Sequence, residues 1–145
     1  MMLKLFTRIR NYLLIKKYPF LECRNVWTDT KINTSYDITW LDDLPIGWRR
    51  RFGKAICEDL KTLFKKSKTK GYIKKYRLHQ IKEKYGQLRW YDNGVPDDIY
   101  DDYNRLIDKY TKLSEITCIM CGKKGEIDTT QFWLYPVCKK HKELN

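Results

Sequence analysis

The sequence predicts an α+β fold in which two or three helices surround a small antiparallel hairpin, and a short cysteine-rich tail follows them. Apolar residues recur at helical spacing within 46–66 and again from residue 99 onward, and two strand-forming runs flank a tight turn near residue 86. We expect a single domain over residues 1–145, made of an N-terminal basic helix in 1–24, a helix–hairpin–helix core in 40–117 and the tail in 118–145.

The charge of the chain is concentrated in its middle. The 145 residues include 30 Lys and Arg against 18 Asp and Glu, a formal net charge of +12. Residues 46–91 alone contain fifteen basic and three acidic residues, and acidic stretches at 25–45 and 92–117 flank them. Because 42% of the residues are hydrophobic, the chain is too apolar for a disordered polycation. We therefore expect a folded protein with a basic face for an anionic partner.

The sequence predicts neither a membrane span nor an export signal. No apolar run approaches the roughly 18–20 residues that cross a bilayer. Lys4, Arg8 and Arg10 interrupt the N-terminal segment, where a secretory signal would need about 7–15 apolar residues. The five cysteines are odd in number and unevenly spaced, which argues against a disulfide framework. We expect a cytoplasmic protein with reduced cysteines.

The first expected element is a helix from Leu3 to Lys17, which Pro19 ends. One face of this helix is apolar and consists of Leu5, Phe6, Ile9, Tyr12 and Leu13. A basic amphipathic helix of this kind suits a membrane surface or a partner. A terminal helix docked on the core is the interpretation that we favour, since most amphipathic helices bury their apolar face.

The core begins after Pro45. Apolar residues at helical spacing predict an amphipathic helix over 46–66, with the stripe Trp48, Phe52, Ala55, Ile56, Leu60, Leu63 and Phe64. The preceding segment from Trp27 to Trp40 is expected to be a loop with at most a short strand.

A hairpin and a second helix complete the predicted core. Strands are expected over Tyr76–Lys82 and Gln87–Tyr91, with Gly86 free to take a positive φ in the turn. The last helix has Pro96 near its first turn and acidic residues beside it, as the helix dipole favours. Its apolar stripe is Ile99, Tyr103, Leu106, Ile107, Tyr110 and Leu113.

The strongest motif is Cys118-Ile-Met-Cys121-Gly122 together with Cys138-Lys-Lys-His141, and sixteen residues separate Cys121 from Cys138. Two thiolates at this spacing hold one ion from a tight turn that Gly122 permits, and the second pair completes a tetrahedron. Three sulfurs and one imidazole suit zinc, and four protein ligands leave no open position for an activated water. We predict one structural Zn²⁺, held in either a ribbon or a treble-clef knuckle.

No catalytic pattern accompanies the metal motif. Cys23 and Cys57 have no partner at metal-ligand spacing, His79 stands alone on a predicted strand, and we expect all three to be core or surface residues. A Cys57–His79 catalytic dyad is the alternative, and no specific feature of the sequence supports it. The sequence contains neither a P-loop nor a dinucleotide fingerprint. We therefore predict a protein that is not an enzyme.

Several of these features stand in an order that resembles a family of small proteins of unknown function from bacteriophages and prophages. The order is Gly47-Trp48, then the hairpin QIKEKYGQLRWY over 80–91, then Leu113-Ser114 and the cysteine tail. The likeness covers about residues 40–145, and the hairpin is its most specific part. The chain is also similar to zinc-binding anti-CRISPR proteins. This resemblance implies an inhibitor in the host bacterial cytosol that docks on a type II CRISPR effector nuclease and blocks its DNA loading or activation.

Two kinds of partner compete for the basic face, and the remaining alternative is a solvated face that only confers solubility. An inhibitor would dock on an acidic protein surface through aromatic and Arg anchors. A nucleic-acid-binding phage accessory protein would contact phosphates instead. The residues expected at the partner surface are Trp48, Arg49, Arg50, Arg51, Lys54, Lys65, Lys66, Lys68, Lys74, Lys75, Arg89 and Trp90.

Overall fold

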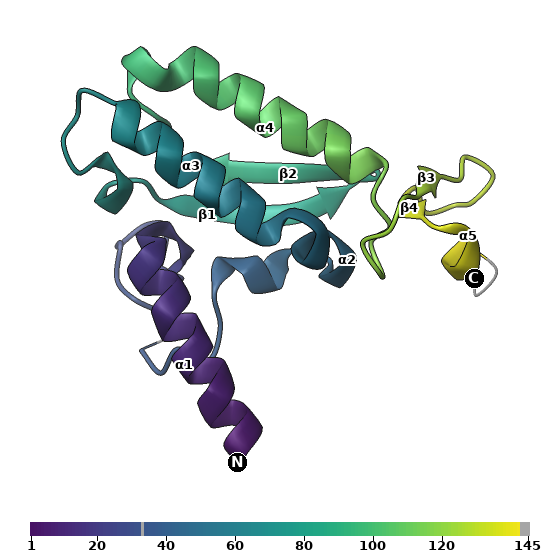
Figure 1. Ribbon diagram of the computed structural model, residues 1–145, viewed down its shortest axis with the longest axis horizontal. Coiled ribbons are helices and arrows are strands. Elements are labelled where there is room, and N and C mark those ends of the chain that lie inside the picture. The colour runs from purple at the N-terminus through teal and green to yellow at the C-terminus, as the bar shows by residue number, and fades with distance from the viewer. Residues whose placement is uncertain (33, 143–145) are drawn as a thin grey trace.

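The computed structural model describes residues 1–32 and 34–142. Residue 33, in the predicted loop, and residues 143–145, at the end of the predicted tail, lie outside the described residues. The α+β class is confirmed, with helices packed on an antiparallel hairpin (Figure 1). The helices are α1 (Met2–Lys17), α2 (Ile46–Trp48), α3 (Lys54–Lys66), α4 (Tyr100–Glu115) and α5 (Lys139–Lys142). The strands are β1 (Leu78–Lys84), β2 (Gln87–Asp92), β3 (Glu126–Ile127) and β4 (Pro136–Val137), paired β1 with β2 and β3 with β4.

The predicted helix over 46–66 is present as α2 and α3 joined by a π-helical turn, Arg49–Gly53. Its apolar stripe faces the core, where Trp48, Phe52, Ile56, Leu60 and Phe64 are almost fully buried. Together with α4, α3 covers one face of the β1–β2 hairpin (Figure 1). The expected stripe of α4 is confirmed as well, because its members are buried or packed against the core.

The β1–β2 hairpin turns more tightly than the sequence suggests. The first strand continues to Lys84, which pairs with Gln87, so the loop contains only Tyr85 and Gly86. Both residues have positive φ, 53° and 80°, as a type I′ turn requires. The expected positive φ of Gly86 is therefore confirmed, and Tyr85 adopts the same left-handed region without the freedom of a glycine.

A buried hydrogen-bond network fixes the inner face of the hairpin. The indole nitrogen of Trp90 donates to the Tyr76 hydroxyl at 2.9 Å, and that hydroxyl donates to Asp92 at 2.8 Å. Tyr103 on α4 also donates to Asp92. Since each buried polar group has a partner, the network holds β2 against α4 without an unsatisfied donor.

The N-terminal helix forms where it was predicted, but it docks by its other face. Asn11 is fully buried and donates to the Tyr36 carbonyl at 2.8 Å, Arg8 pairs with Asp37 at 2.8 Å, and Leu14 and Ile15 pack on the core. The expected docking face is exposed instead, and α1 extends away from the hairpin (Figure 1). Among the described residues, no helix has the length and apolar character to cross a membrane.

Candidate functional site

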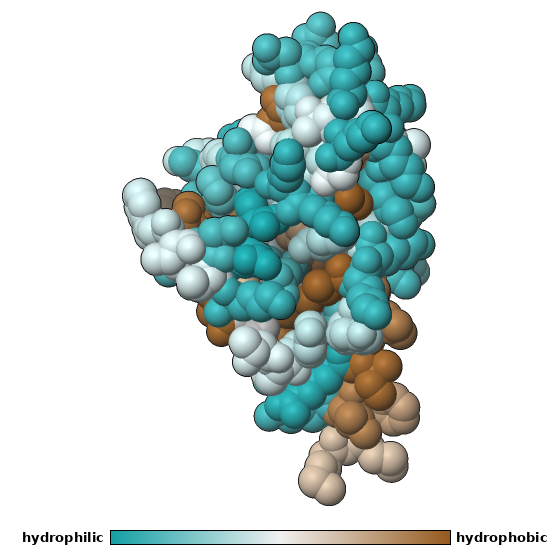
Figure 2. Space-filling model, turned by 90° about the vertical axis from the view of Figure 1, so that its left-hand side faces the viewer, coloured by the Kyte–Doolittle hydropathy of each residue, from teal (hydrophilic) through white to brown (hydrophobic). Residues whose placement is uncertain are grey.

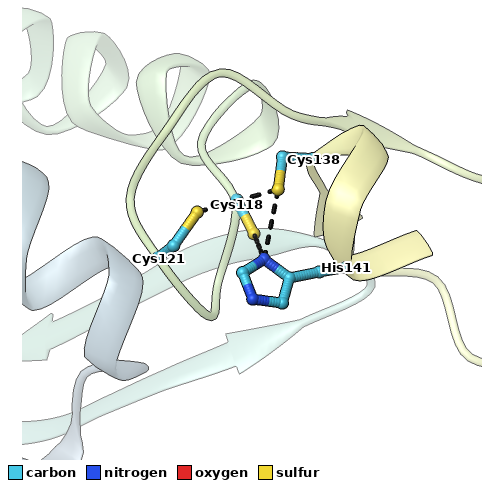
Figure 3. Close-up of side chains that lie close together, drawn as sticks. All are labelled: Cys118, Cys121, Cys138 and His141. Carbon is cyan, nitrogen blue, oxygen red and sulfur yellow. Dashed lines mark hydrogen bonds between the residues drawn. The ribbon is translucent and has the colours of Figure 1, made fainter. Parts of the chain in front are cut away.

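The structure brings the four predicted metal ligands together. The ligand atoms of Cys118, Cys121, Cys138 and His141 all lie within 4.8 Å of one another, and Figure 3 shows their side chains converging. The first two come from the turn after α4, Cys138 directly precedes α5, and His141 lies within α5. This cluster can hold a metal ion.

Local backbone structure places each ligand pair. The Cys118 carbonyl accepts from the Gly122 amide at 2.9 Å, and Gly122 has φ +80°, so the chain doubles back within the first pair. The β3–β4 hairpin follows, and the second pair stands at the first turn of α5, where the His141 amide donates to the Cys138 carbonyl at 3.0 Å. A knuckle, a hairpin and a helix that carries the second pair form a treble clef, whereas a ribbon would take both pairs from knuckles.

Two of the three close distances between ligand atoms fit a tetrahedral ion. With metal–sulfur bonds of about 2.3 Å and metal–nitrogen bonds of about 2.05 Å, tetrahedral angles place two sulfurs about 3.8 Å apart and a sulfur and a nitrogen about 3.6 Å apart. The Cys121 and Cys138 sulfurs are 3.7 Å apart, and the Cys118 sulfur is 3.5 Å from His141 Nδ1. The Cys138 sulfur is closer to that nitrogen, at 3.1 Å. The first two distances differ from the values expected around a tetrahedral ion by only about 0.1 Å.

The site favours a thiolate at one of its cysteines. Burial would raise the pKa of the Cys118 thiol, but backbone hydrogen bonds from Cys138, Cys121 and Met120 outweigh it and lower that pKa to about 6. At Cys121, a backbone hydrogen bond from Lys123 lowers the pKa of the thiol. Burial and the adjacent thiols of Cys118 and Cys138 together raise it by more, so the pKa of Cys121 lies above its usual value. Thiols so close together repel when both ionise, and a bound cation removes that repulsion.

Two glycines fasten the knuckle to the core. The Gly47 amide on α2 donates to the Ile119 carbonyl at 2.7 Å, and the neighbouring Trp48 indole donates to the Thr117 carbonyl at 2.8 Å. A Cβ added at Gly47 would lie 2.0 Å from the Cys118 carbonyl oxygen, and one at Gly122 would lie 2.6 Å from the Gly47 oxygen. The two backbones touch, so only glycine fits at either position.

The predicted partner residues do not form one surface. Arg50, Arg51 and Lys54 are exposed at the start of α3, whereas Arg49 pairs with Asp42. A second exposed group lies at the other end of α3 and in the segment after it, and consists of Lys65, Lys66, Lys68, Lys74 and Lys75. Arg89 stands apart from both groups, on β2.

The two predicted aromatic anchors are core residues, which corrects the sequence interpretation. Trp48 is fully buried, and its indole holds the Thr117 carbonyl. Trp90 is 8% exposed and belongs to the network of Tyr76 and Asp92. Neither side chain can reach a partner.

A basic face on the hairpin emerges instead, and sequence reasoning named only Arg89 of its members. We call it the outer hairpin face: Lys82, Lys84, Arg89 and Tyr91. These residues alternate with the buried Ile81, Leu88 and Trp90, so they point away from α3 and α4. None of its three cations has a carboxylate within ion-pair distance in the part of the chain that the structure describes. The period-two alternation of the strands was the signal that could have found this face.

The other candidate reactive groups are poor nucleophiles. Burial raises the pKa of the Cys57 thiol far above its usual range and, with help from nearby Asp43, raises that of Cys23 to about 11. Both thiols therefore stay protonated near neutral pH. His79 lies on β1, half-buried.

No family model matches this chain, nor does a curated protein or a solved structure.

Proposed function

We propose that this protein is a non-enzymatic, zinc-stabilised binding protein that holds the phosphate backbone of nucleic acid on its outer hairpin face. The observation that supports the proposal most directly is the pairing of Lys82 with Arg89. They stand directly opposite each other on adjacent strands. Like charges in that position destabilise a hairpin because they repel each other. An anion bound between them removes this repulsion.

The carboxylates nearest to these cations in the sequence are occupied elsewhere. Glu83 accepts a hydrogen bond from the Gly86 amide at 2.6 Å, inside the turn. Asp92 accepts from Tyr76 and Tyr103 in the core. The outer hairpin face therefore presents three positive charges to solvent, and a phosphate chain is the ligand that matches such a row.

Tyr91 gives the face a second means of binding. Its ring is 45% exposed, and the Lys82 ammonium lies 5.7 Å from the ring centroid. An exposed ring beside cations can stack on an unpaired base while the cations hold phosphates, a combination typical of single-strand binding. We therefore propose single-stranded RNA or DNA as the preferred ligand class.

We infer that the bound ion is one structural Zn²⁺. Three sulfur ligands and one imidazole suit zinc, whereas calcium and magnesium require oxygen ligands. Cys118, Cys121, Cys138 and His141 would hold the ion, which would supply a cross-link between the knuckle and α5 rather than an activated water. Four protein ligands and two buried, protonated thiols elsewhere support a role without catalysis.

A salt titration with fluorescently labelled oligonucleotides tests nucleic-acid binding. We expect single strands to bind more tightly than duplexes, and the Lys82→Gln/Arg89→Gln variant to lower the slope of log K against log salt by about 2. Tyr91→Leu should weaken single-strand binding while leaving that slope unchanged, because it removes stacking and no charge.

The matched control is Lys109→Gln/Lys112→Gln, which removes the same charge from exposed positions on α4. If this control lowers the affinity and the salt slope as much as the hairpin variant, binding reflects net charge alone. The outer hairpin face is then not the site.

A second candidate function is inhibition of a bacterial defence nuclease in the host cytosol, as the anti-CRISPR resemblance implies. The aromatic pair Phe132 and Trp133 supports it: the rings stack edge to face with centroids 5.4 Å apart, and they are 90% and 71% exposed. Exposed aromatics of this kind are common anchors in protein interfaces.

Affinity capture of a type II effector nuclease, after digestion of all free nucleic acid, separates the two candidates. Inhibitor docking predicts that the nuclease stays bound to the wild-type protein and is lost with Phe132→Ser/Trp133→Ser. Nucleic-acid binding predicts that capture disappears on digestion and that this variant behaves like the wild type.

A further inference from the structure

The outward face of α1, which we define as Leu5, Phe6, Ile9 and Leu13, is an apolar surface without a cover in the described structure. These side chains are 58%, 64%, 47% and 58% exposed. Figure 2 shows hydrophobic surface gathered at the lower end of the molecule, where the N-terminal part of α1 lies. A contiguous apolar patch of this kind on a folded protein marks an interaction surface.

The face is turned away from the body of the protein by the way α1 is anchored. Asn11 is buried against the Tyr36 carbonyl, while Arg8 pairs with Asp37 on the same side. At about 100° of rotation per residue, Ile9 and Leu13 each lie about 160° around the helix axis from Asn11. The polar anchor therefore holds the apolar residues on the opposite side, where they form a continuous stripe along the helix.

The charge of α1 has one sign. The helix contains Lys4, Arg8, Arg10, Lys16 and Lys17 and no acidic residue. Arg8 and Lys17 are paired with Asp37 and Glu58, but Arg10 and Lys16 have no carboxylate within ion-pair distance among residues 1–32 and 34–142. These two cations border the outward face. A binding surface that covered the apolar residues would therefore also meet both positive charges.

We propose that the outward face of α1 binds a membrane surface rich in anionic lipids. Leu5, Phe6, Ile9 and Leu13 enter the boundary between headgroups and acyl chains, and Arg10 and Lys16 contact anionic headgroups. A second copy of the chain is the less suitable occupant, because pairing two such helices would set five bases against five bases. An anionic lipid surface supplies both the apolar and the negative partner that this face lacks. The proposal uses residues apart from the outer hairpin face.

Flotation with lipid vesicles, in the absence of nucleic acid, tests the proposal on the full chain. We expect the protein to float with vesicles of phosphatidylcholine and phosphatidylglycerol, and at least about ten-fold less with phosphatidylcholine alone, since several basic residues contribute to the attraction. Phe6→Gln/Ile9→Gln should reduce binding to the anionic vesicles about ten-fold or more, and Arg10→Gln/Lys16→Gln should reduce it by a smaller factor.

Two controls isolate the helix. Ile32→Gln/Ile116→Gln removes two other exposed apolar side chains, and Lys109→Gln/Lys112→Gln removes two other positive charges; both should float like the wild type. Far-UV circular dichroism and metal content verify that Phe6→Gln/Ile9→Gln is folded, as expected for exposed positions.

Two results would overturn the proposal. One is equal flotation of Phe6→Gln/Ile9→Gln and its apolar control, which would assign any lipid binding to general charge or to another surface. The other is a wild-type protein that sediments as a dimer without lipid and a Phe6→Gln/Ile9→Gln variant that sediments as a monomer, which would assign the face to a second copy.

Discussion

The two ends of the chain are attached to the helix–hairpin core by different means. The tail is joined backbone to backbone: the Gly47 amide donates to the Ile119 carbonyl at 2.7 Å, and the Gly125 amide donates to the Ile116 carbonyl at 2.8 Å. The helix α1 is held mainly through side chains: Asn11 is bonded to the Tyr36 carbonyl in the loop that precedes the core, and the Tyr18 hydroxyl, directly after α1, is bonded to Glu58 on α3 at 2.5 Å. The attachment of the tail is so close that the backbones leave no room for an added methyl group at Gly47. The attachment of α1 leaves an apolar face of the helix exposed.

The difference means that the tail is held rigidly, whereas α1 keeps an apolar face free to bind. Backbone contact and a cluster of four Cys and His side chains determine the position of the tail, so a small change there has to move main chain. Polar side-chain contacts orient α1 while its apolar residues stay in solvent. Substitutions at the tail should therefore change the stability of the fold, while substitutions on the outward face of α1 should change binding and leave stability almost unaffected.

The largest effect is expected from loss of a metal ligand. Cys118→Ser removes a thiolate from the cluster, and the unfolding free energy should fall by at least about 3 kcal/mol, because metal binding contributes to folding directly. Elemental analysis should find one zinc per wild-type chain and less in the variant. Hydrogen exchange should increase in the knuckle, β3, β4 and α5 and stay unchanged in α1.

Cys23→Ser is the matched control, since Cys23 is a buried thiol outside the cluster. It should keep its zinc and lose only about 1 kcal/mol. Should Cys118→Ser unfold at the same temperature as the wild type, the tail contributes nothing to the stability of the core.

The next largest effect should come from Gly47→Ala. The added methyl would meet the Cys118 carbonyl oxygen at 2.0 Å and the Gly122 nitrogen at 2.7 Å, both backbone atoms. We expect a loss of about 2–4 kcal/mol in urea unfolding. At Gly53, in the following π turn, an added methyl has its closest contact at 3.4 Å. Gly53→Ala should change stability by less than about 1 kcal/mol, and an equal loss in both variants would contradict the close approach.

The elements of the core and the metal cluster were predictable because their signals are local. Helical spacing marks the stripe from Trp48 to Phe64, and a turn between two β-rich runs marks the hairpin. The four ligands follow from their spacing, since two residues between ligands fit a tight turn around one ion. The choice between ribbon and treble clef depends on whether the chain is helical after Cys138, and that segment is too short for a periodic signal.

Surface assignments failed where nearness in the sequence was taken for nearness in space. Trp48 belongs to the predicted apolar stripe and Trp90 lies two residues from the buried Leu88, so the periodicities that placed the elements also placed both indoles inside. The docking face of α1 was wrong for another reason. Amphipathicity shows which face is apolar, but the contact that anchors the helix, Asn11 on the Tyr36 carbonyl, joins residues 25 positions apart.

A smaller loss is expected at the anchor of α1. Asn11→Ala removes the buried donor of a partly buried hydrogen bond to the Tyr36 carbonyl and should cost about 1–3 kcal/mol. Asn104→Ala, at an exposed position of α4, should cost less than about 0.5 kcal/mol. Hydrogen exchange distinguishes the mechanism: the increase in Asn11→Ala should centre on α1 and leave the metal knuckle protected. Faster exchange throughout the tail would show that the two attachments are coupled.

The smallest effect is expected from acid, and it should act on the α1 attachment. The hydrogen bonds of Asp37 with Arg8 and then Ser35 lower the pKa of Asp37 from 3.8 to about 2. A carboxylate with a lowered pKa in the folded state stabilises the fold above its unfolded pKa, and that stabilisation is lost as the pH falls from about 4 to about 2. Arg8→Gln should therefore be less stable than the wild type near neutral pH, and the difference should close over this acid range. Urea unfolding of both proteins across the range measures it, and a difference that persists at about pH 2 would show that Arg8 stabilises α1 by packing rather than by its charge.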